Sequence, residues 1–328
     1  MSFKDIKGNT RVKNILRKSL QKNRMPNSLL FYGHEGVGKM DTAMVVAKAL
    51  NCEQATDDAC ERCSSCKSIN SGNFPDVMVI SPEKDVIKIN QIRMLKKMAY
   101  LKPMIGKKRV FIVKNAEKMK NEAANSLLKV LEEPPLFSYI ILLTQNPYII
   151  LPTIKSRCQM LSFSTVSRED IEELLIQKGY EKEKARIISI FVQGNLKQAL
   201  SLEWDEVEER RKEVWNIFLS CMGKGKLSNF FKNSSSQFLI RKEVEQTLEI
   251  LSSFFRDLIL IKENGDEHLL MNPDYREETR EVENVFKIED IMDFIREIDY
   301  ALYGVKINLN VNLLLSSMIS SFQVSKYV

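Results

Sequence analysis

A strand, a glycine-rich loop and a helix follow one another between residues 28 and 50, and this order strongly constrains the fold. Ser28–Tyr32 is a short apolar run typical of a buried strand, and Asp41–Leu50 has the spacing of an amphipathic helix. The loop between them, GHEGVGKM, contains Gly33, Gly36, Gly38 and Lys39. A strand that leads through such a loop into a helix is typical of the first βαβ unit of a parallel sheet.

Four further apolar runs alternate with helical patterns up to about residue 165. The predicted strands are Asp76–Ile80, Arg109–Val113, Tyr139–Leu143 and Gln159–Phe163. The predicted helices include Asn90–Leu101 and Asn121–Glu133, and the Pro134-Pro135 pair ends the second one. Strands that alternate with helices favour a parallel sheet covered on both faces. We therefore predict an α/β domain with a five-stranded parallel sheet over residues 1–165.

The strand signal ends near residue 165, and the rest of the chain shows helical patterns. Ser167, an N-cap serine followed by acidic residues, begins a small helical domain that we predict over 166–204. Longer amphipathic patterns follow, including Val244–Ile261 and Ile288–Tyr303. Because 328 residues suffice for two or three domains, we predict a third, all-α domain over 205–328.

The net charge of +6 hides an asymmetry between the two halves of the chain. Residues 1–165 contain 27 Lys+Arg and 14 Asp+Glu, whereas residues 166–328 contain 22 and 29. A basic first half suggests a polyanionic partner, although a solvated charged face explains it equally well. The sequence shows no secretion signal and no apolar run near the roughly 18 residues that span a bilayer. We expect a soluble cytoplasmic protein with no membrane partner.

The glycine loop fits the phosphate-binding pattern G-x-x-x-x-G-K-[ST] except at its last position. Met40 stands where a hydroxyl would bind Mg²⁺, and a thioether is a poor ligand for a hard cation. The strand Arg109–Val113 ends in Lys114-Asn115, where active NTPases carry carboxylates that support Mg²⁺ and position water. We expect that phosphate can still bind but that hydrolysis does not occur here. Whether ATP or ADP is held stays open.

Four of the six cysteines lie within fifteen residues, at Cys52, Cys60, Cys63 and Cys66. Cytosolic thiols stay reduced, so this cluster favours a metal site over disulfides. Two C-x2-C steps supply three soft ligands from one tight turn, and Cys52 completes a tetrahedral set typical of zinc. Since four protein ligands leave no open position, we predict a structural zinc in an insertion at 52–66.

Several motifs in the first 165 residues point to a known family. They are FKDIKGN at 3–9, MPNSLLF at 25–31, AANSLLKVLEEPP at 123–135 and SRC at 156–158. Together they resemble the bacterial clamp-loader subunits of the AAA+ family. The degenerate phosphate loop with a cysteine cluster resembles the delta-prime type of DNA polymerase III, because the gamma/tau type keeps the complete Mg²⁺-binding set. The resemblance implies an AAA+ module, a three-helix lid and a C-terminal helical collar that assembles with other subunits.

The resemblance also implies roles for single residues. Arg157 of the SRC motif matches an arginine finger that reaches ATP bound by a neighbouring subunit, and a surface ion pair is the alternative. Thr144 matches a residue that senses the γ-phosphate, or is only a capping hydroxyl. Lys197 stands where active relatives carry a lid arginine, and lysine lacks the planar guanidinium fork.

The function implied is that of a subunit that does not hydrolyse ATP but completes the ATPase assembly that loads the sliding clamp onto primed DNA in replication. The expected partners are the gamma/tau ATPase subunits, the delta subunit and, through the assembly, the sliding clamp and primer-template DNA. Two other interpretations stay open. One is an active AAA+ ATPase of the gamma/tau or branch-migration type. The other is a zinc-dependent nucleic-acid-binding protein with a vestigial glycine loop.

Basic residues cluster around one predicted helix and the strand after it. They are Lys88, Arg93, Lys96, Lys97, Lys102, Lys107, Lys108 and Arg109. One hypothesis is that they follow DNA phosphates, which would give sequence-independent and salt-sensitive binding. Ordinary solubilising charge is at least as good an explanation.

Overall fold

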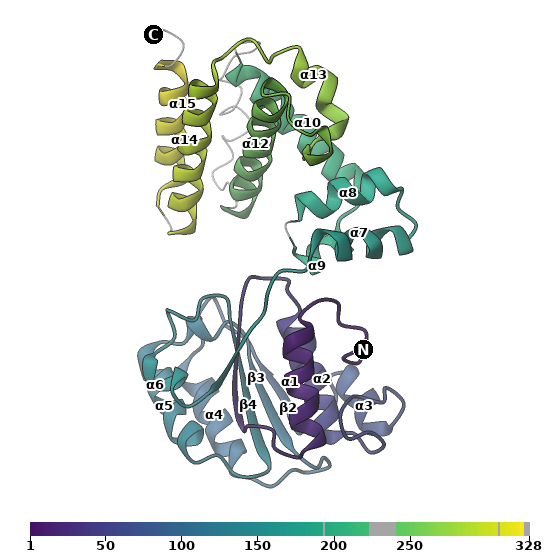
Figure 1. Cartoon of the computed structure of the whole chain (residues 1–328). Coiled ribbons are helices and arrows are strands. Elements are labelled where there is room, and N and C mark those ends of the chain that lie inside the picture. The colour runs from purple at the N-terminus through teal and green to yellow at the C-terminus, as the bar shows by residue number, and fades with distance from the viewer. Residues whose placement is uncertain (193, 223–240, 308, 325–328) are drawn as a thin grey trace. The chain divides into compact units, whose positions relative to one another are not determined.

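The computed structural model describes residues 1–192, 194–222, 241–307 and 309–324 (Figure 1). Its contacts divide the chain into two compact units. The first comprises residues 1–185 and 192–201, and the second comprises 186–191 and the described residues from 202 onward. Each unit has a hydrophobic core of its own. The finer division of the chain into sheet domain, lid and collar stays a prediction.

A five-stranded parallel sheet forms the centre of the first unit, with the strand order β2-β3-β4-β1-β5. The strands are β1 Ser28–Tyr32, β2 Val77–Ile80, β3 Arg109–Val113, β4 Ser138–Thr144 and β5 Gln159–Ser162. Each pairs in parallel with its neighbours, and β1 pairs with both β4 and β5. The predicted α/β fold with five parallel strands is confirmed.

Helices cover both faces of this sheet (Figure 1). On one side are α1 Thr10–Gln21, α2 Lys39–Asn51 and α3 Ser64–Asn70, and on the other are α4 Ile89–Ala99, α5 Asn121–Glu132 and α6 Pro152–Lys155. Alternate residues of a strand enter opposite cores. In β3, Val110 and Ile112 pack in the cluster with α1 and α2, whereas Phe111 and Val113 pack in the cluster with α4 and α5. Burial on both faces explains why the central strands are continuously apolar.

Three short helices follow the sheet. They are α7 Arg168–Gln177, α8 Lys182–Phe191 and α9 Leu196–Ser201. The Oγ of Ser167 accepts a hydrogen bond from the N–H of Asp170 at 3.1 Å, which confirms the predicted N-cap. The second unit contains α10 Trp204–Cys221, α12 Arg241–Lys262, α13 Arg276–Arg280, α14 Ile288–Lys306 and α15 Val311–Val324. These longer helices and the short α13 build most of the second unit, which also includes residues 186–191 at the end of α8.

The core of the second unit is rich in aromatic side chains. Trp215, Phe218 and Phe254 lie with ring centroids 5.0–5.7 Å apart. The helical patterns predicted at Val244–Ile261 and Ile288–Tyr303 correspond to α12 and α14. Across the described ranges, no helix is both long enough and apolar enough to span a membrane.

A buried ion pair anchors the loop between α4 and β3. The side chains of Asp76 and Arg109 are 0% and 3% exposed, and Arg109 Nη2 lies 2.8 Å from Asp76 Oδ1. Backbone N–H groups of Met104, Ile105 and Gly106 donate to the same carboxylate. Burial alone would raise the pKa of Asp76, but these donors outweigh it and lower the pKa below its ordinary value. The hypothesis that Arg109 follows DNA phosphates is therefore wrong, because its guanidinium is buried and bound.

We predict that Asp76→Asn lowers the free energy of unfolding by about 3 kcal/mol at pH 7, because the variant leaves Arg109 buried without its counter-charge. The folded pKa is lowered, so the contribution is complete above the unfolded pKa of about 3.9 and is lost as the pH falls through the folded pKa. Urea unfolding followed by circular dichroism at several pH values measures both effects.

The matched control is Asp85→Asn, since the Asp85 side chain is 92% exposed. It should change the free energy of unfolding by less than about 0.5 kcal/mol. Equal unfolding curves for the two variants would contradict the role of the buried pair.

Candidate functional site

The glycine loop connects β1 to α2 in a form that only glycine permits at two positions. Gly33 has φ 144°, and a Cβ there would lie 2.2 Å from the carbonyl oxygen of Phe163. Gly36 has φ 77°, and a Cβ there would lie 1.7 Å from Oδ1 of Asn195. Gly38 is the N-cap of α2. The loop therefore ends at a helix N-terminus, where backbone N–H groups favour an anion such as phosphate.

A pocket of about 300 Å³ lies beside this loop at the carboxyl ends of the central strands. Its lining consists of Glu35, Gly36, Gly38, Lys39, Met40, Asp41, Lys114, Asn115, Leu143, Thr144, Gln145 and Lys197. The structure thus brings together all the residues proposed for nucleotide binding except Gly33, which lies in the loop outside the lining. Parallel strands end at the same edge of a sheet, so β1, β3 and β4 all contribute to this pocket.

Lys39 is held within the loop by its own backbone. Its ammonium donates hydrogen bonds to the carbonyl oxygens of Gly33 and His34, the second at 2.5 Å. Burial lowers the pKa of Lys39 to about 8, although the carboxylates of Glu117 and Glu35 oppose this shift. An anion in the pocket would favour the charged form of Lys39.

Thr144 ends β4 with its side chain buried. Its hydroxyl donates to the carbonyl oxygen of Asn146 at 3.1 Å. This contact agrees with the interpretation of Thr144 as a capping hydroxyl. Because Thr144 also lines the pocket, its proposed contact with phosphate stays a prediction.

Arg157 lies two residues before β5, away from the residues that line the pocket. Its Nη2 forms an ion pair with Oε1 of Glu132 at 2.7 Å, and its Nη1 donates to the carbonyl oxygen of Thr153 at 2.9 Å. The Arg157 and Glu132 side chains are 35% and 46% exposed. The surface ion pair of the alternative interpretation is therefore present, and the guanidinium is also open to solvent.

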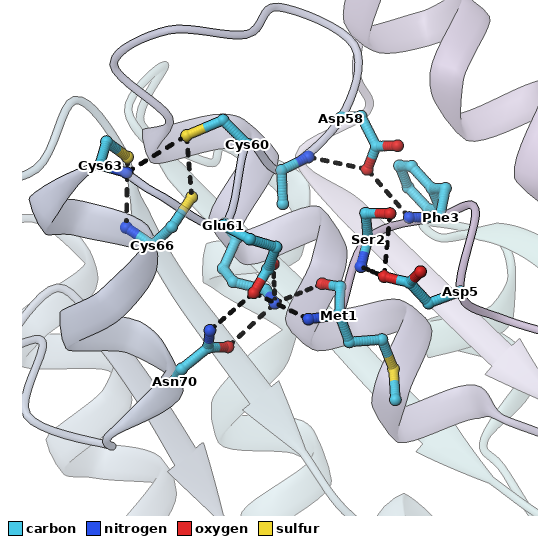
Figure 2. A network of polar contacts seen from close by, with 12 residues as sticks. Met1, Ser2, Phe3, Asp5, Asp58, Cys60, Glu61, Cys63, Cys66 and Asn70 are labelled. Atoms are coloured by element: carbon cyan, nitrogen blue, oxygen red, sulfur yellow. Dashed lines mark hydrogen bonds and ion pairs between the residues drawn. The ribbon is translucent and has the colours of Figure 1, made fainter.

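The four clustered cysteines converge in space. Their Sγ atoms all lie within 4.8 Å of one another, and Figure 2 shows Cys60, Cys63 and Cys66 together. Cys52 is the C-cap of α2, and Cys63 is the N-cap of α3. Backbone N–H groups donate to three of the sulfurs: Ala55 to Cys52, Cys63 to Cys60 and Cys66 to Cys63, at 3.3–3.4 Å. The cluster could bind a metal such as zinc.

The chemistry of this donor set fits zinc. Three of the cysteines are buried and Cys60 is partly buried, so water has limited access to the sulfurs. N–H donors aimed at sulfur stabilise the thiolate form, which is the form that binds the metal. A bound ion would have four protein ligands and a structural role.

Sequence reasoning missed a buried lysine of α2 that contacts the insertion containing the cysteines. Lys48 is only 1% exposed, and its ammonium contacts the carbonyl oxygen of Met1, the Glu61 carboxylate and Oδ1 of Asn70. These partners meet in Figure 2 beside the cysteines. Burial opposes the charge on Glu61, but its hydrogen bonds lower its pKa to about 2. The available signal was a single lysine within the apolar run AMVVAKAL.

Comparisons with known proteins follow the two-part pattern of the chain. A family profile described as "DNA polymerase III, delta subunit" matches residues 8–167, and "DNA polymerase III, delta subunit, C terminal" matches 210–323. The chain is 33% identical to the DNA polymerase III subunit delta' of Bacillus subtilis (strain 168), over 79% of this chain and 80% of that protein. It is 28% identical to the DNA polymerase III subunit tau of the same organism, over 79% of this chain.

The chain spans half the length of that tau subunit. Among solved structures, a DNA polymerase III gamma subunit-related protein from Thermotoga maritima aligns over 95% of this chain and 97% of its own, with a TM-score of 0.45 and 20% identity. The Bacillus subtilis DNA clamp loader delta protein aligns over 95% and 99%, with a TM-score of 0.37 and 13% identity.

We predict about one zinc ion per chain in protein purified without chelator, measured by elemental mass spectrometry. Cys63→Ser should remove most of the metal and lower the thermal midpoint of unfolding, because the insertion depends on the ion for its fold. Cys158→Ser is the control, since Cys158 lies outside the cluster and should leave the metal content unchanged. Full metal content in Cys63→Ser would contradict the site.

Proposed function

Because the chain belongs to the DNA polymerase III delta' subunit family, we propose that it is a non-hydrolysing clamp-loader subunit that supplies Arg157 in trans to a neighbouring ATPase subunit. The observation that carries the proposal is the chemistry of the pocket. Met40, Lys114 and Asn115 line it at the positions where hydrolysis needs a hydroxyl and two carboxylates.

Hydrolysis of a nucleoside triphosphate requires a metal held on the phosphates and a water molecule in line with the bond that breaks. A thioether at Met40 and an ammonium at Lys114 cannot supply ligands for Mg²⁺. The glycine loop and Lys39 keep the groups that bind phosphate. This combination supports binding without turnover.

The position of Arg157 suits a role outside its own pocket. Its ion pair with Glu132 is partly exposed, and such pairs contribute only about 0–1 kcal/mol. Exchange of this carboxylate for a phosphate is therefore inexpensive, and a bidentate contact with phosphate is among the stronger charge-assisted hydrogen bonds. An arginine supplied in trans accelerates phosphoryl transfer by about 10³–10⁵-fold.

The proposed partners follow from the same family. The chain is similar to tau and gamma/tau subunits over 61–79% of its length, so we propose the gamma/tau ATPase and delta subunits as direct neighbours. The sliding clamp and primer-template DNA would be reached through that assembly. The described helices of the second unit would form the collar, and replication of DNA would place the protein in the cytoplasm.

We predict that Arg157→Ala reduces the ATPase rate of a reconstituted clamp loader, stimulated by clamp and primed DNA, by at least about tenfold. The assay combines this chain with the gamma/tau and delta subunits of the same organism. Gel filtration should show normal assembly, because the side chain of Arg157 is partly exposed and contributes little to folding. An unchanged rate would remove the trans role.

Two further variants distinguish a role of Arg157 as an arginine finger from a role in the surface ion pair alone. Glu132→Ala breaks the same ion pair but keeps the arginine, so its effect on the rate should be much smaller than that of Arg157→Ala. Arg24→Ala, at an exposed arginine before β1, should leave the rate unchanged. Equal effects of Glu132→Ala and Arg157→Ala would favour the ion pair. ATP turnover by the purified chain, abolished by Lys39→Ala, would favour an active gamma/tau-like subunit instead.

A further inference from the structure

We propose that the pocket binds a nucleoside di- or triphosphate without Mg²⁺, and that Lys114 supplies the positive charge that the metal supplies in active NTPases. The inference deepens the proposed function, since it rests on a pocket that binds without hydrolysis. It concerns residues of this chain alone and does not involve Arg157.

Lys114 occupies the place from which a carboxylate would support the metal. It follows β3 directly, and its backbone N–H donates to the carbonyl oxygen of Ile80 at 2.8 Å, which fixes its position at the sheet edge. Lys114 is one of the residues that line the pocket, and it is partly buried. Within the described ranges, its ammonium has no hydrogen-bond or ion-pair partner, so it is available to an anionic ligand.

Three lysines from different elements line the pocket. Lys39 comes from the start of α2, Lys114 directly follows β3, and Lys197 comes from α9. Two carboxylates, of Glu35 and Asp41, also line the pocket, and the Glu117 carboxylate lies close enough to Lys39 to oppose the lowering of its pKa. An ammonium attracts phosphate oxygens as a metal ion does, so this lining can hold a polyphosphate whether or not Mg²⁺ is present.

Met40 provides a second argument that this pocket binds nucleotide without Mg²⁺. Its side chain packs against the hydrophobic core that contains α1 and α2, as a core residue does. The metal ligand is therefore replaced by an apolar anchor, and the carboxylate that would support the metal is replaced by a cation. A nucleotide bound here would need the charge of Lys114, because roughly two to four negative charges on its phosphates would otherwise face Lys39 and the loop N–H groups alone.

Asp41 offers the competing explanation. It lies in the first turn of α2 next to Met40, and a carboxylate is a normal ligand for Mg²⁺. If Asp41 held the metal, nucleotide binding would depend on Mg²⁺ and on Asp41. The proposal requires instead that nucleotide binding depend neither on Mg²⁺ nor on Asp41.

The test measures binding of fluorescent ADP and ATP analogues to the full chain, in EDTA and in Mg²⁺. We expect dissociation constants that differ by less than about threefold between the two conditions. Lys114→Ala and Lys114→Met should each weaken binding by at least about tenfold in EDTA, the second variant keeping the apolar stem of the side chain. Lys118→Ala is the matched control, because Lys118 lies in the next turn and pairs with Asp85 outside the pocket. It should leave binding unchanged.

A double variant introduces the metal ligands that active NTPases carry at these two positions. Met40→Thr combined with Lys114→Asp should make binding depend on Mg²⁺ by at least about tenfold. Thermal unfolding monitors whether each variant is folded.

Three results would overturn the proposal. The first is no binding of either nucleotide by the folded wild type in either condition. The second is binding that requires Mg²⁺ and is lost in Asp41→Ala. The third is tripolyphosphate that competes as tightly as ATP, which would overturn the assignment of a nucleotide. None of these results depends on the Arg157→Ala assay, so the two proposals fail separately.

Discussion

The pairing of β1 with both β4 and β5 is the interaction on which the sites of the first unit depend. Tyr32 pairs with Thr144 on one side and with Ser162 on the other, so three strands end side by side at the glycine loop. A parallel sheet has two unlike edges, because all its strands begin at one and end at the other. Arg157 precedes β5 and therefore lies towards the edge where the strands begin. The sheet separates the phosphate loop of this chain from the arginine proposed to act on a neighbour.

Helix α2 joins the phosphate loop to the cysteine cluster. Its N-terminus is formed by Gly38, and its C-terminus leads into Cys52. Next to Cys52, Asn51 Oδ1 accepts from the N–H of Lys108 at 2.9 Å, while Lys107 Nζ donates to the Cys52 carbonyl oxygen at 2.6 Å. The side chain of Lys107 thus binds within its own chain. The loop before β3 therefore holds the far end of the same helix that presents the phosphate loop, at the point where the cysteine-containing insertion begins.

Much of this fold could be predicted from the sequence, because its signals are local. Continuous apolar runs located all five strands to within about one residue at most ends, and cysteine spacing located a cluster whose sulfurs do converge. The contacts of Asp76 with Arg109 and of Lys48 with Glu61 could not be predicted in the same way. Asp76 and Arg109 are 33 residues apart and meet because β2 pairs with β3. Lys48 and Glu61 are 13 residues apart and meet because the insertion turns back onto α2. Arg109 illustrates this limit, since nothing in the segment KKRV distinguishes a buried arginine from exposed lysines.

The close approach of Gly36 and Asn195 has a consequence for how this sequence can vary. Oδ1 of Asn195 accepts from the N–H of Gln198 at 3.0 Å and so caps the start of α9, while the same atom occupies the space that a Cβ at position 36 would need. A side chain at position 36 would have to displace the Asn195 side chain from this cap and would also have to adopt a φ of 77°, which residues other than glycine rarely adopt. Substitutions in the phosphate loop and at the start of α9 are therefore coupled. Covariation between positions 36 and 195 is expected among homologues that keep this geometry.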